Sequence, residues 1–309
     1  MNVAYLFPGQ GSQAVGMGKD LYDRSAEARA LFDRADEALG FSISKIAFEG
    51  PEEELRLTQN TQPALLVVST AACRLLDRDP VVAAGHSLGE YSALVAAGSI
   101  RFEDAVVLVH KRGRYMQEAV PVGAGGMAAV LGVPGDEVER RLAGVRLGIV
   151  EIANWNSDDQ IVISGERTAV EEALAVIKAP RSVMLPVSAP FHSRLMKPAE
   201  EKLAVDLDAV EFADPRFPII TNVEARLVRT GAEAREALKR QVSRSVLWTK
   251  SMAVMKEMDI DACVEIGPGK VLAGLVKRIA RSWPKAPAIH NVDSWEGAAK
   301  ARQALFGVL

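Results

Sequence analysis

A serine flanked by glycines, in the stretch Gly85-His86-Ser87-Leu88-Gly89, is the part of this chain best suited to nucleophilic chemistry. The apolar residues 81–84 before it predict a strand, and residues 88–97 after it predict a helix. A G-x-S-x-G pattern between strand and helix is typical of a nucleophile elbow, which exposes the serine hydroxyl on a sharp turn. The glycines are a steric requirement, because a side chain at either position would collide with the neighbouring strand or helix. The alternative is a tight glycine turn that carries no chemistry.

A serine hydroxyl is a weak nucleophile and needs an adjacent base, for which the histidines are the candidates. We expect His86 to point away from the reacting face of the serine, His110 to lie in a helix and His290 in a short strand. His192 lies in a loop, residues 188–193, just before another predicted helix. A histidine that follows the elbow in sequence is typical of α/β-hydrolase sites. By elimination, His192 is the predicted base.

The composition is that of a soluble globular enzyme, with 49% hydrophobic and 25% charged residues among 309. A net charge of −3 argues against a nucleic-acid partner. Because there is no apolar stretch of membrane-spanning length and no basic region ahead of an apolar one at the N-terminus, we expect no membrane partner and a cytoplasmic location. Cys73 and Cys263 lie in apolar stretches and are predicted to be buried thiols, with no disulfide framework and no metal site.

Strand and helix patterns alternate along most of the chain, which predicts a parallel α/β domain. After the glycine-rich hinge 121–126 the pattern changes to β-α-β-β-α-β, the order of a ferredoxin-like unit. We therefore predict a core from residues 1–124 and 190–309 and an inserted subdomain from residues 125–189. The main predicted core strands are 3–7, 81–84, 218–221, 262–266 and 288–292, and the main predicted core helices are 25–39, 63–76 (with Pro63 in the first turn), 88–97 and 103–119. The predicted subdomain strands are 127–133, 148–153, 160–164 and 182–187, and its predicted helices are 136–143 and 168–178.

The glycine-rich loop 7–14, after the first predicted strand, has two functional interpretations. Gly9, Gly11 and Ala14 fit a relaxed dinucleotide fingerprint, but the region about 20 residues on, where a second strand should end in an acidic residue, is strongly helical. The loop fits an oxyanion loop better, in which a backbone N–H at the end of the strand binds an acyl carbonyl together with the N–H of Leu88. A plain strand-to-helix turn is the structural alternative.

Arg112 gives the most useful indication of the substrate. On the predicted helix 103–119 it shares one face with Ala105, Val109 and Met116, so its guanidinium should face the core or a cleft. A buried guanidinium needs an anion, and its planar fork suits a carboxylate. The functional interpretation is a clamp for a free carboxylate on an acyl group. The alternatives are an internal salt bridge and a side chain that extends to solvent.

Six motifs that run in order along nearly the whole chain resemble those of malonyl-CoA:acyl carrier protein transacylases. They are FPGQGSQ at 7–13, GHSLGEY at 85–91, KRGRYMQ at 111–117, NWNSDDQIVISG at 154–165, the Pro190-Phe191-His192 loop and EIGPGKVL at 265–272. The resemblance implies an α/β fold: a hydrolase-like core with a mostly parallel sheet and an inserted ferredoxin-like α+β subdomain. It also implies transfer of malonyl from malonyl-CoA to the phosphopantetheine thiol of holo acyl carrier protein, with release of coenzyme A. The transfer would proceed by a ping-pong route, supply extender units for fatty-acid synthesis, and use no cofactor; the family expectation is a monomer.

The resemblance assigns roles to five matching positions. It implies Ser87 as the acylated nucleophile and His192 as its base. It implies Arg112 as the clamp for the malonyl carboxylate. The backbone amides of Gln10 and Leu88 would form the oxyanion hole.

Three further positions would support the site. The main-chain carbonyl of Gln241 would orient the histidine, Phe191 beside the base would favour malonyl over methylmalonyl, and Asn156 of the fourth motif is a supporting residue. One departure from the family is Ser245-Val246-Leu247 before Trp248, where Pro-Val is usual. With an ordinary histidine pKa of about 6.5, we expect activity to fall in mild acid.

Other functions remain open. The chain could serve a polyketide or malonate decarboxylase system, or act as a serine thioesterase or esterase, which is disfavoured by Arg112 and by the absence of an HGGG-type loop. It could also be a non-enzymatic module that binds a carrier protein, with the elbow as a packed turn. Lys270, Lys277, Arg278 and Arg281 form either a basic face for an acidic carrier protein or an ordinary solvated helix face.

Overall fold

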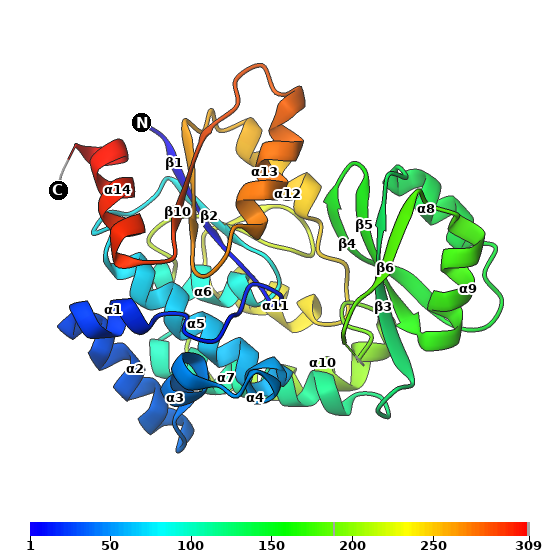
Figure 1. Ribbon diagram of the computed structural model, residues 1–309, viewed down its shortest axis with the longest axis horizontal. Coiled ribbons are helices and arrows are strands. Elements are labelled where there is room, and N and C mark those ends of the chain that lie inside the picture. The colour runs from blue at the N-terminus through cyan, green and yellow to red at the C-terminus, as the bar shows by residue number, and fades with distance from the viewer. Residues whose placement is uncertain (188, 308–309) are drawn as a thin grey trace.

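The computed structural model describes residues 1–187 and 189–307, and the larger of its two sheets, sheet A, has the strand order β10-β9-β1-β2-β7-β8. Neighbouring strands are parallel except for β8, which is antiparallel to β7. The strands are β1 Val3–Phe7, β2 Val82–Gly85, β7 Ile219–Ile220, β8 Leu227–Val228, β9 Ala262–Ile266 and β10 Ala288–Val292. This is the predicted mostly parallel core (Figure 1), with the short strand β8 as an unpredicted addition.

Helices cover both faces of sheet A. They are α1 Lys19–Arg24, α2 Ala26–Leu39, α3 Ile43–Glu49, α4 Glu52–Arg56, α5 Thr58–Arg74, α6 Leu88–Ala96, α7 Phe102–Glu118, α10 Lys197–Asp208, α11 Gly231–Gln241, α12 Trp248–Lys256, α13 Val271–Ile279 and α14 Trp295–Phe306. Successive side chains of a strand point to opposite faces, so Tyr5 and Phe7 pack among α2, α5, α6 and α7, whereas Ala4 and Leu6 pack against α12 and α13. No helix in the described part of the chain is long and apolar enough to cross a bilayer.

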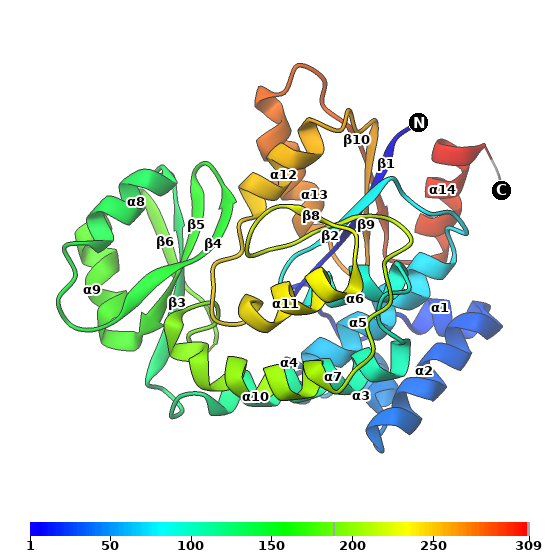
Figure 2. The ribbon, with the colours of Figure 1, turned by 180° about the vertical axis from the view of Figure 1, so that it is seen from behind.

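A second sheet, sheet B, lies to one side of the core and is antiparallel throughout, with the strand order β4-β5-β3-β6 (Figure 1, Figure 2). Its strands are β3 Gly125–Leu131, β4 Val150–Ser157, β5 Gln160–Glu166 and β6 Arg181–Met184, and its helices are α8 Gly135–Leu142 and α9 Arg167–Ile177. This is the predicted β-α-β-β-α-β unit. Strand β6 ends at Met184 before the predicted residue 187, because the chain bends there and the Val187 N–H donates to the Leu185 carbonyl at 2.8 Å.

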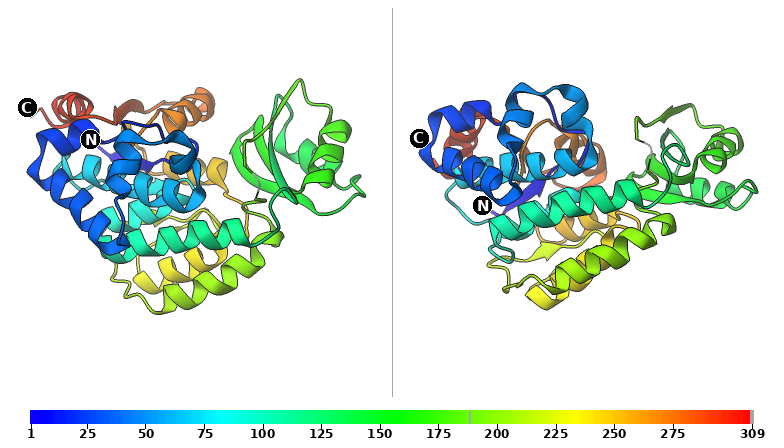
Figure 3. Two further views of the ribbon diagram at one scale, coloured as in Figure 1. Left: turned by 60° about the horizontal axis from the view of Figure 1, so that its bottom comes forward. Right: turned by 90° about the horizontal axis from the view of Figure 1, so that it is seen from below.

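The two lobes are joined beside a pair of long helices. Helix α10 lies next to α7, and both point toward the lobe of sheet B (Figure 3). The Lys111 ammonium and the Tyr115 hydroxyl of α7 bind the Asp206 carboxylate of α10 at 2.6 and 2.8 Å. Ser188, in the segment between β6 and α10, and residues 308–309 lie outside the described residues.

Helix α5 begins at Thr58, which corrects the prediction that Pro63 lies in the first turn of a helix 63–76. A proline inside a helix has no N–H for the carbonyl four residues earlier, which is that of Gln59. The Nδ1 atom of His110, on α7, lies 2.8 Å from this carbonyl oxygen and donates to it. A contact distant in sequence therefore satisfies the group that Pro63 leaves unpaired. His110 thereby has a structural partner on α5.

The register of sheet A brings three loops to one edge. Phe7 at the end of β1 pairs with Gly85 at the end of β2, and Ala84 pairs with Ile220 at the end of β7. The segments that follow these strands carry Gln10, Ser87 and Asn222. The carboxyl edge of a parallel sheet is where α/β proteins usually bind ligands.

Candidate active site

Ser87 lies on the turn between β2 and α6, as the G-x-S-x-G pattern predicts. Its φ of 52° and ψ of −105° are rare for a residue with a side chain, so the surrounding structure must hold the turn. A Cβ at Gly85 would lie 1.9 Å from the main-chain carbon of Gly89, and a Cβ at Gly89 would lie 1.9 Å from the Phe7 carbonyl oxygen. The prediction that both glycines are sterically required is confirmed.

The imidazole of His192 lies beside the Ser87 hydroxyl, with Nε2 2.7 Å from Oγ. Its Nδ1 lies 2.9 Å from the Gln241 carbonyl oxygen and 3.2 Å from that of Arg244. Because a carbonyl oxygen can only accept, Nδ1 carries the proton, and Nε2 can accept one from the serine. Main-chain carbonyls thus stand where a Ser-His-Asp triad has its carboxylate.

The environment of His192 keeps its ring neutral. The residue is 5% exposed. Burial and, next to it, the positive charge of Arg112 lower the pKa of His192 from 6.5 to about 3. The ring therefore remains a free base in mild acid. The lowered pKa predicts that reactivity persists in mild acid, whereas an ordinary histidine pKa predicts a fall there.

Arg112 lies in the interior next to the nucleophile. It is 1% exposed, which excludes a side chain that extends to solvent. One guanidinium nitrogen donates to Gln62 Oε1 at 2.8 Å, and the other donates to Ser87 Oγ at 3.0 Å and to Gln241 Oε1 at 2.8 Å. Among residues 1–187 and 189–307 it forms no ion pair, which excludes the internal salt bridge, and its Nε has no hydrogen-bond partner. The guanidinium also lies over the Tyr91 ring, 5.5 Å from its centroid. A buried cation that has only neutral partners within hydrogen-bond distance leaves room for an anionic ligand.

A small cavity of about 120 Å³ joins these groups. Gln10, Ser87, Leu88, Arg112 and His192 line its polar side. Within the described residues, the backbone N–H groups of Gln10 and Leu88 have no acceptor. Two free amides beside a serine hydroxyl can bind a carbonyl oxygen that gains negative charge. The apolar side is lined by Met116, Met127, Leu185, Val187 and Phe191.

Of the remaining predicted positions, Asn156 contacts His86. The Nε2 atom of His86 donates to Asn156 Oδ1 at 2.8 Å, and burial lowers the pKa of this imidazole. The His86 ring therefore binds Asn156 and not the Ser87 hydroxyl, although it lines the same small cavity. His290 is half-buried on β10, away from this cavity.

Two buried polar residues beside Ser87 were not predicted as site residues. Asn222 follows β7, and its Oδ1 accepts from the Ser87 N–H at 2.7 Å. Glu90 lies on α6 within the GHSLGEY motif, is 1% exposed, and burial raises its pKa to about 7. The available sequence signals are a single carboxylate in an apolar helix and an asparagine at the carboxyl edge of the sheet. Neither signal by itself distinguishes a site residue from a satisfied core group.

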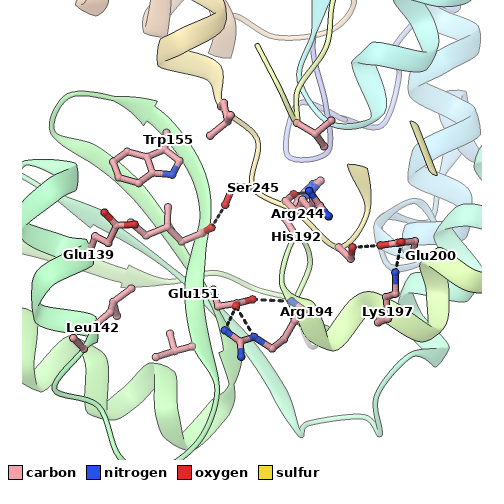
Figure 4. A pocket seen from close by; sticks show the side chains of 16 residues that line it. Glu139, Leu142, Glu151, Trp155, His192, Arg194, Lys197, Glu200, Arg244 and Ser245 are labelled. Carbon is pink, nitrogen blue, oxygen red and sulfur yellow. Dashed lines mark hydrogen bonds and ion pairs between the residues drawn. The ribbon is translucent and has the colours of Figure 1, made fainter. Parts of the chain in front are cut away.

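A larger cavity of about 840 Å³ lies between sheet B and the core (Figure 4). Glu139, Glu151 and Trp155 line it from the sheet B lobe, and Arg194 and Arg244 line it from the segments around His192. Figure 4 shows Arg194 paired with Glu151 across this space, at 2.5 Å. His192 lines both cavities, so the larger one adjoins the base of the dyad.

Comparisons with known proteins agree with this architecture. Residues 4–303 match the acyl transferase domain family. The malonyl CoA-acyl carrier protein transacylase of Bacillus subtilis (strain 168) is 47% identical over 287 residues, which cover 90% of this chain and 90% of that protein. The solved structure of the malonyl CoA-acyl carrier protein transacylase from Coxiella burnetii has a TM-score of 0.95 at 40% identity and covers 99% of this chain and 98% of its own. A malonyl-transacylase solved in complex with a type II PKS acyl-carrier protein has a TM-score of 0.94 at 41% identity and covers 98% of this chain and 100% of its own.

The domain match and the α/β core with its second sheet define the class of the protein, an acyl transferase. At this level of identity over most of both chains, the chain belongs to the malonyl CoA-acyl carrier protein transacylase family. The resemblance of the six motifs is thereby confirmed. The departure at Ser245-Val246-Leu247 leaves Gln241 within reach of His192.

Proposed function

We propose that this protein transfers a malonyl group from malonyl-CoA to the phosphopantetheine thiol of an acyl carrier protein through a malonyl-serine at Ser87. The observation that carries the proposal is the guanidinium of Arg112. It is buried, it forms no ion pair within the described residues, and it touches the Ser87 hydroxyl at 3.0 Å. A substrate carboxylate supplies the missing anion and accepts two parallel hydrogen bonds.

The position of Arg112 also favours a short diacid. In a malonyl-serine, one methylene separates the ester carbonyl from the free carboxylate, so the carboxylate stays close to Oγ. An arginine 3.0 Å from Oγ suits this length. The small cavity, about 120 Å³, limits the acyl group further.

In the first half-reaction, His192 Nε2 takes the Ser87 proton as Oγ attacks the thioester carbonyl. The oxyanion accepts hydrogen bonds from the N–H groups of Gln10 and Leu88. The C–S bond then breaks, His192 returns its proton to the sulfur, and coenzyme A leaves as a thiol. In the second half-reaction, the thiol of the carrier protein loses its proton to His192 and attacks the malonyl ester. Collapse of this intermediate breaks the C–O bond and returns the proton to Ser87 Oγ.

We place the protein in the cytoplasm as a monomer that uses malonyl-CoA and holo acyl carrier protein, needs no cofactor, and supplies extender units for fatty-acid synthesis. The similarity to a transacylase solved with a type II PKS acyl-carrier protein favours a second candidate, supply of a polyketide system. Relative kcat/KM values for carrier proteins of the two systems distinguish these roles.

Intact-protein mass spectrometry tests the reaction. Wild type incubated with malonyl-CoA should gain one malonyl group on Ser87, hold it without an acceptor, and lose it to holo carrier protein. Ser87→Ala should gain none. Ser92→Ala, which removes another serine hydroxyl from α6, is the matched control and should be malonylated normally. Rapid release of malonate without transfer would identify a thioesterase, and a wild type that is never malonylated would refute the proposal.

A further inference from the structure

Two amide side chains bind the backbone of the strained turn at Ser87. The Asn222 side chain accepts from the Ser87 N–H at 2.7 Å and donates to the Gly85 carbonyl at 2.6 Å. The Gln241 side chain donates through Nε2 to the Ser87 carbonyl at 2.9 Å. Both backbone groups of the nucleophile are therefore bound by residues distant in sequence. These contacts oppose relaxation of a turn whose φ is 52°.

One carboxylate oxygen connects these two residues. Glu90 Oε2 accepts from the Asn222 backbone N–H at 3.0 Å and from Gln241 Nε2 at 2.8 Å. Glu90 and Asn222 are each 1% exposed and Gln241 is fully buried, so water does not replace these bonds. A buried donor that loses its acceptor keeps the full cost of desolvation, which makes each bond a strong constraint.

The carboxylate also determines which way the Gln241 amide faces. With Nε2 on Glu90 and Ser87, the Gln241 Oε1 accepts from Arg112 at 2.8 Å. A flipped amide would set its NH₂ group against the guanidinium donors and its oxygen against two acceptors. Glu90 therefore links the nucleophile to the arginine through a single amide orientation.

We propose that Glu90 is a positioning residue: its Oε2 fixes Asn222 and Gln241, which in turn hold the Ser87 turn and the Arg112 guanidinium. The inference deepens the proposed function and rests on it. Glu90 touches neither Ser87 Oγ nor the small cavity, so it acts through these neighbours.

Three variants test the role. Glu90→Leu removes the acceptor, Glu90→Gln keeps an amide oxygen that can accept both bonds, and Glu265→Leu removes a second carboxylate that is also 1% exposed. Glu265 accepts from the Leu272 and Ala273 N–H groups at the start of α13, so its loss is a matched control for destabilisation. Two rates are measured per folded molecule: malonylation by malonyl-CoA, and sulfonylation of Ser87 by phenylmethylsulfonyl fluoride, a neutral reagent that needs no carboxylate clamp.

Displacement of a reacting group by about 1 Å costs about 100-fold in rate, so Glu90→Leu should lose about 10- to 100-fold in kcat and in sulfonylation. Glu90→Gln should recover most of both rates. Glu265→Leu should unfold at a lower temperature with wild-type rates. If Glu90→Leu does not fold, Gln241→Leu, which keeps the main-chain carbonyl on His192, should show the same loss.

Several outcomes would overturn the inference: wild-type rates in Glu90→Leu, equal losses in Glu90→Gln and Glu90→Leu, or an equal loss in Glu265→Leu. If Glu90→Leu does not fold, wild-type rates in Gln241→Leu would overturn it as well. Failure of the proposed function gives a different result, in which wild type is sulfonylated at Ser87 but takes no malonyl group. In that case the sulfonylation rates alone decide the role of Glu90.

Discussion

The turn at Ser87 and the loop at His192 are both strained, but they are held in different ways. Ser87 has a φ of 52° and His192 a φ of 59°. The Ser87 turn is confined by backbone on both sides, because a Cβ on either flanking glycine would lie within 1.9 Å of main-chain atoms. The His192 loop is held by three main-chain carbonyls at the end of α11 and just after it: Val242 accepts from its N–H at 3.2 Å, and Gln241 and Arg244 accept from its ring.

Ser87 and His192 are therefore positioned by different parts of the molecule. The nucleophile is positioned by the central sheet, where no atom can move without disturbing the core. The base is positioned by a loop that packs against the sheet B lobe. The packing is close, because a Cβ on Gly125 at the start of β3 would lie 2.3 Å from the Pro190 ring. Changes in the sheet B lobe should therefore displace His192 more than they displace Ser87.

The largest expected effect comes from removal of the base. His192→Ala should slow malonylation of Ser87 by about 10²- to 10⁴-fold, the usual contribution of a general base. Because the dyad acts as a unit, Ser87→Ala and the double variant should be equally inactive. Single-turnover malonylation measures the loss. His290→Ala, which removes a half-buried histidine on β10, is the control, and a loss of similar size there would remove the case for His192.

Arg112 contacts the Ser87 hydroxyl and lowers the pKa of His192. Its removal tests whether the guanidinium between these two residues also binds the carboxylate of the substrate. Arg112→Ala should lower kcat/KM for malonyl transfer by about 30-fold to several thousand-fold, the equivalent of about 2–5 kcal/mol for one partner of a buried charge pair. Acetyl transfer should be unchanged or faster. The exposed neighbour Arg114, replaced by alanine, should leave both transfers unchanged. Equal losses for malonyl and acetyl would show that Arg112 is structural.

Substitution of one glycine in each region tests how firmly the surrounding structure holds Ser87 and His192. In Gly125→Ala the new methyl would lie 2.3 Å from the Pro190 ring and 2.9 Å from the Pro190 backbone nitrogen, so the loop that carries His192 must move, and we expect a cost of about 1–3 kcal/mol in stability. Malonylation should then fall by about 10- to 100-fold. In Gly89→Ala the methyl meets the Phe7 carbonyl, which is fixed in sheet A, so the protein should lose more stability than Gly125→Ala does.

Urea unfolding gives the stability of each glycine variant, and stopped-flow malonylation gives its rate. Gly274→Ala is the control, because a Cβ there meets no atom within 4 Å. If Gly125→Ala keeps the wild-type rate at reduced stability, the contact between Gly125 and Pro190 does not position His192.

The pH dependence separates the causes of the shift at His192. Since the pKa of His192 is lowered to about 3, the ring is neutral at pH 5.5 and sulfonylation of Ser87 by a neutral reagent should not fall between pH 7.5 and 5.5. The positive charge of Arg112 is the second cause of that lowering. Arg112→Ala should therefore raise the pKa and move the loss of reactivity to higher pH than in wild type. A wild-type loss centred near pH 6.5 would mean that the imidazole is solvated.

Local motifs explain how much of this site could be predicted. Ser87 stands out by its flanking glycines, Arg112 by its helical spacing and His192 by the loop around it. The sheet B lobe was likewise predicted from a local pattern, the β-α-β-β-α-β order of its elements. The contacts that fix them depend on the tertiary fold: 135 residues separate Asn222 from Ser87, and 151 separate Gln241 from Glu90. The start of α5 was missed for the same reason, because the group that completes its first turns belongs to His110 on α7.

The smallest expected effect comes from Phe191, on the loop that carries His192. Phe191 is 7% exposed and forms part of the apolar wall of the small cavity. Phe191→Ser removes a ring and leaves space for the extra methyl of methylmalonyl, and one methylene in an apolar pocket is worth about 10- to 200-fold at most. We expect the kcat/KM ratio of methylmalonyl to malonyl to rise by about 3- to 10-fold, at or below the lower limit of that range, because Met116 and Met127 can move into part of the space.

The control for Phe191→Ser is Phe191→Leu, which keeps an apolar wall and should change the ratio less. Sulfonylation of Ser87 should stay close to wild type in both variants, since neither change touches the carbonyls that hold His192. An unchanged ratio in Phe191→Ser would show that this wall does not set acyl selectivity. A large loss of sulfonylation would show instead that Phe191 helps to hold the base, which would extend the loop's support beyond the three carbonyls.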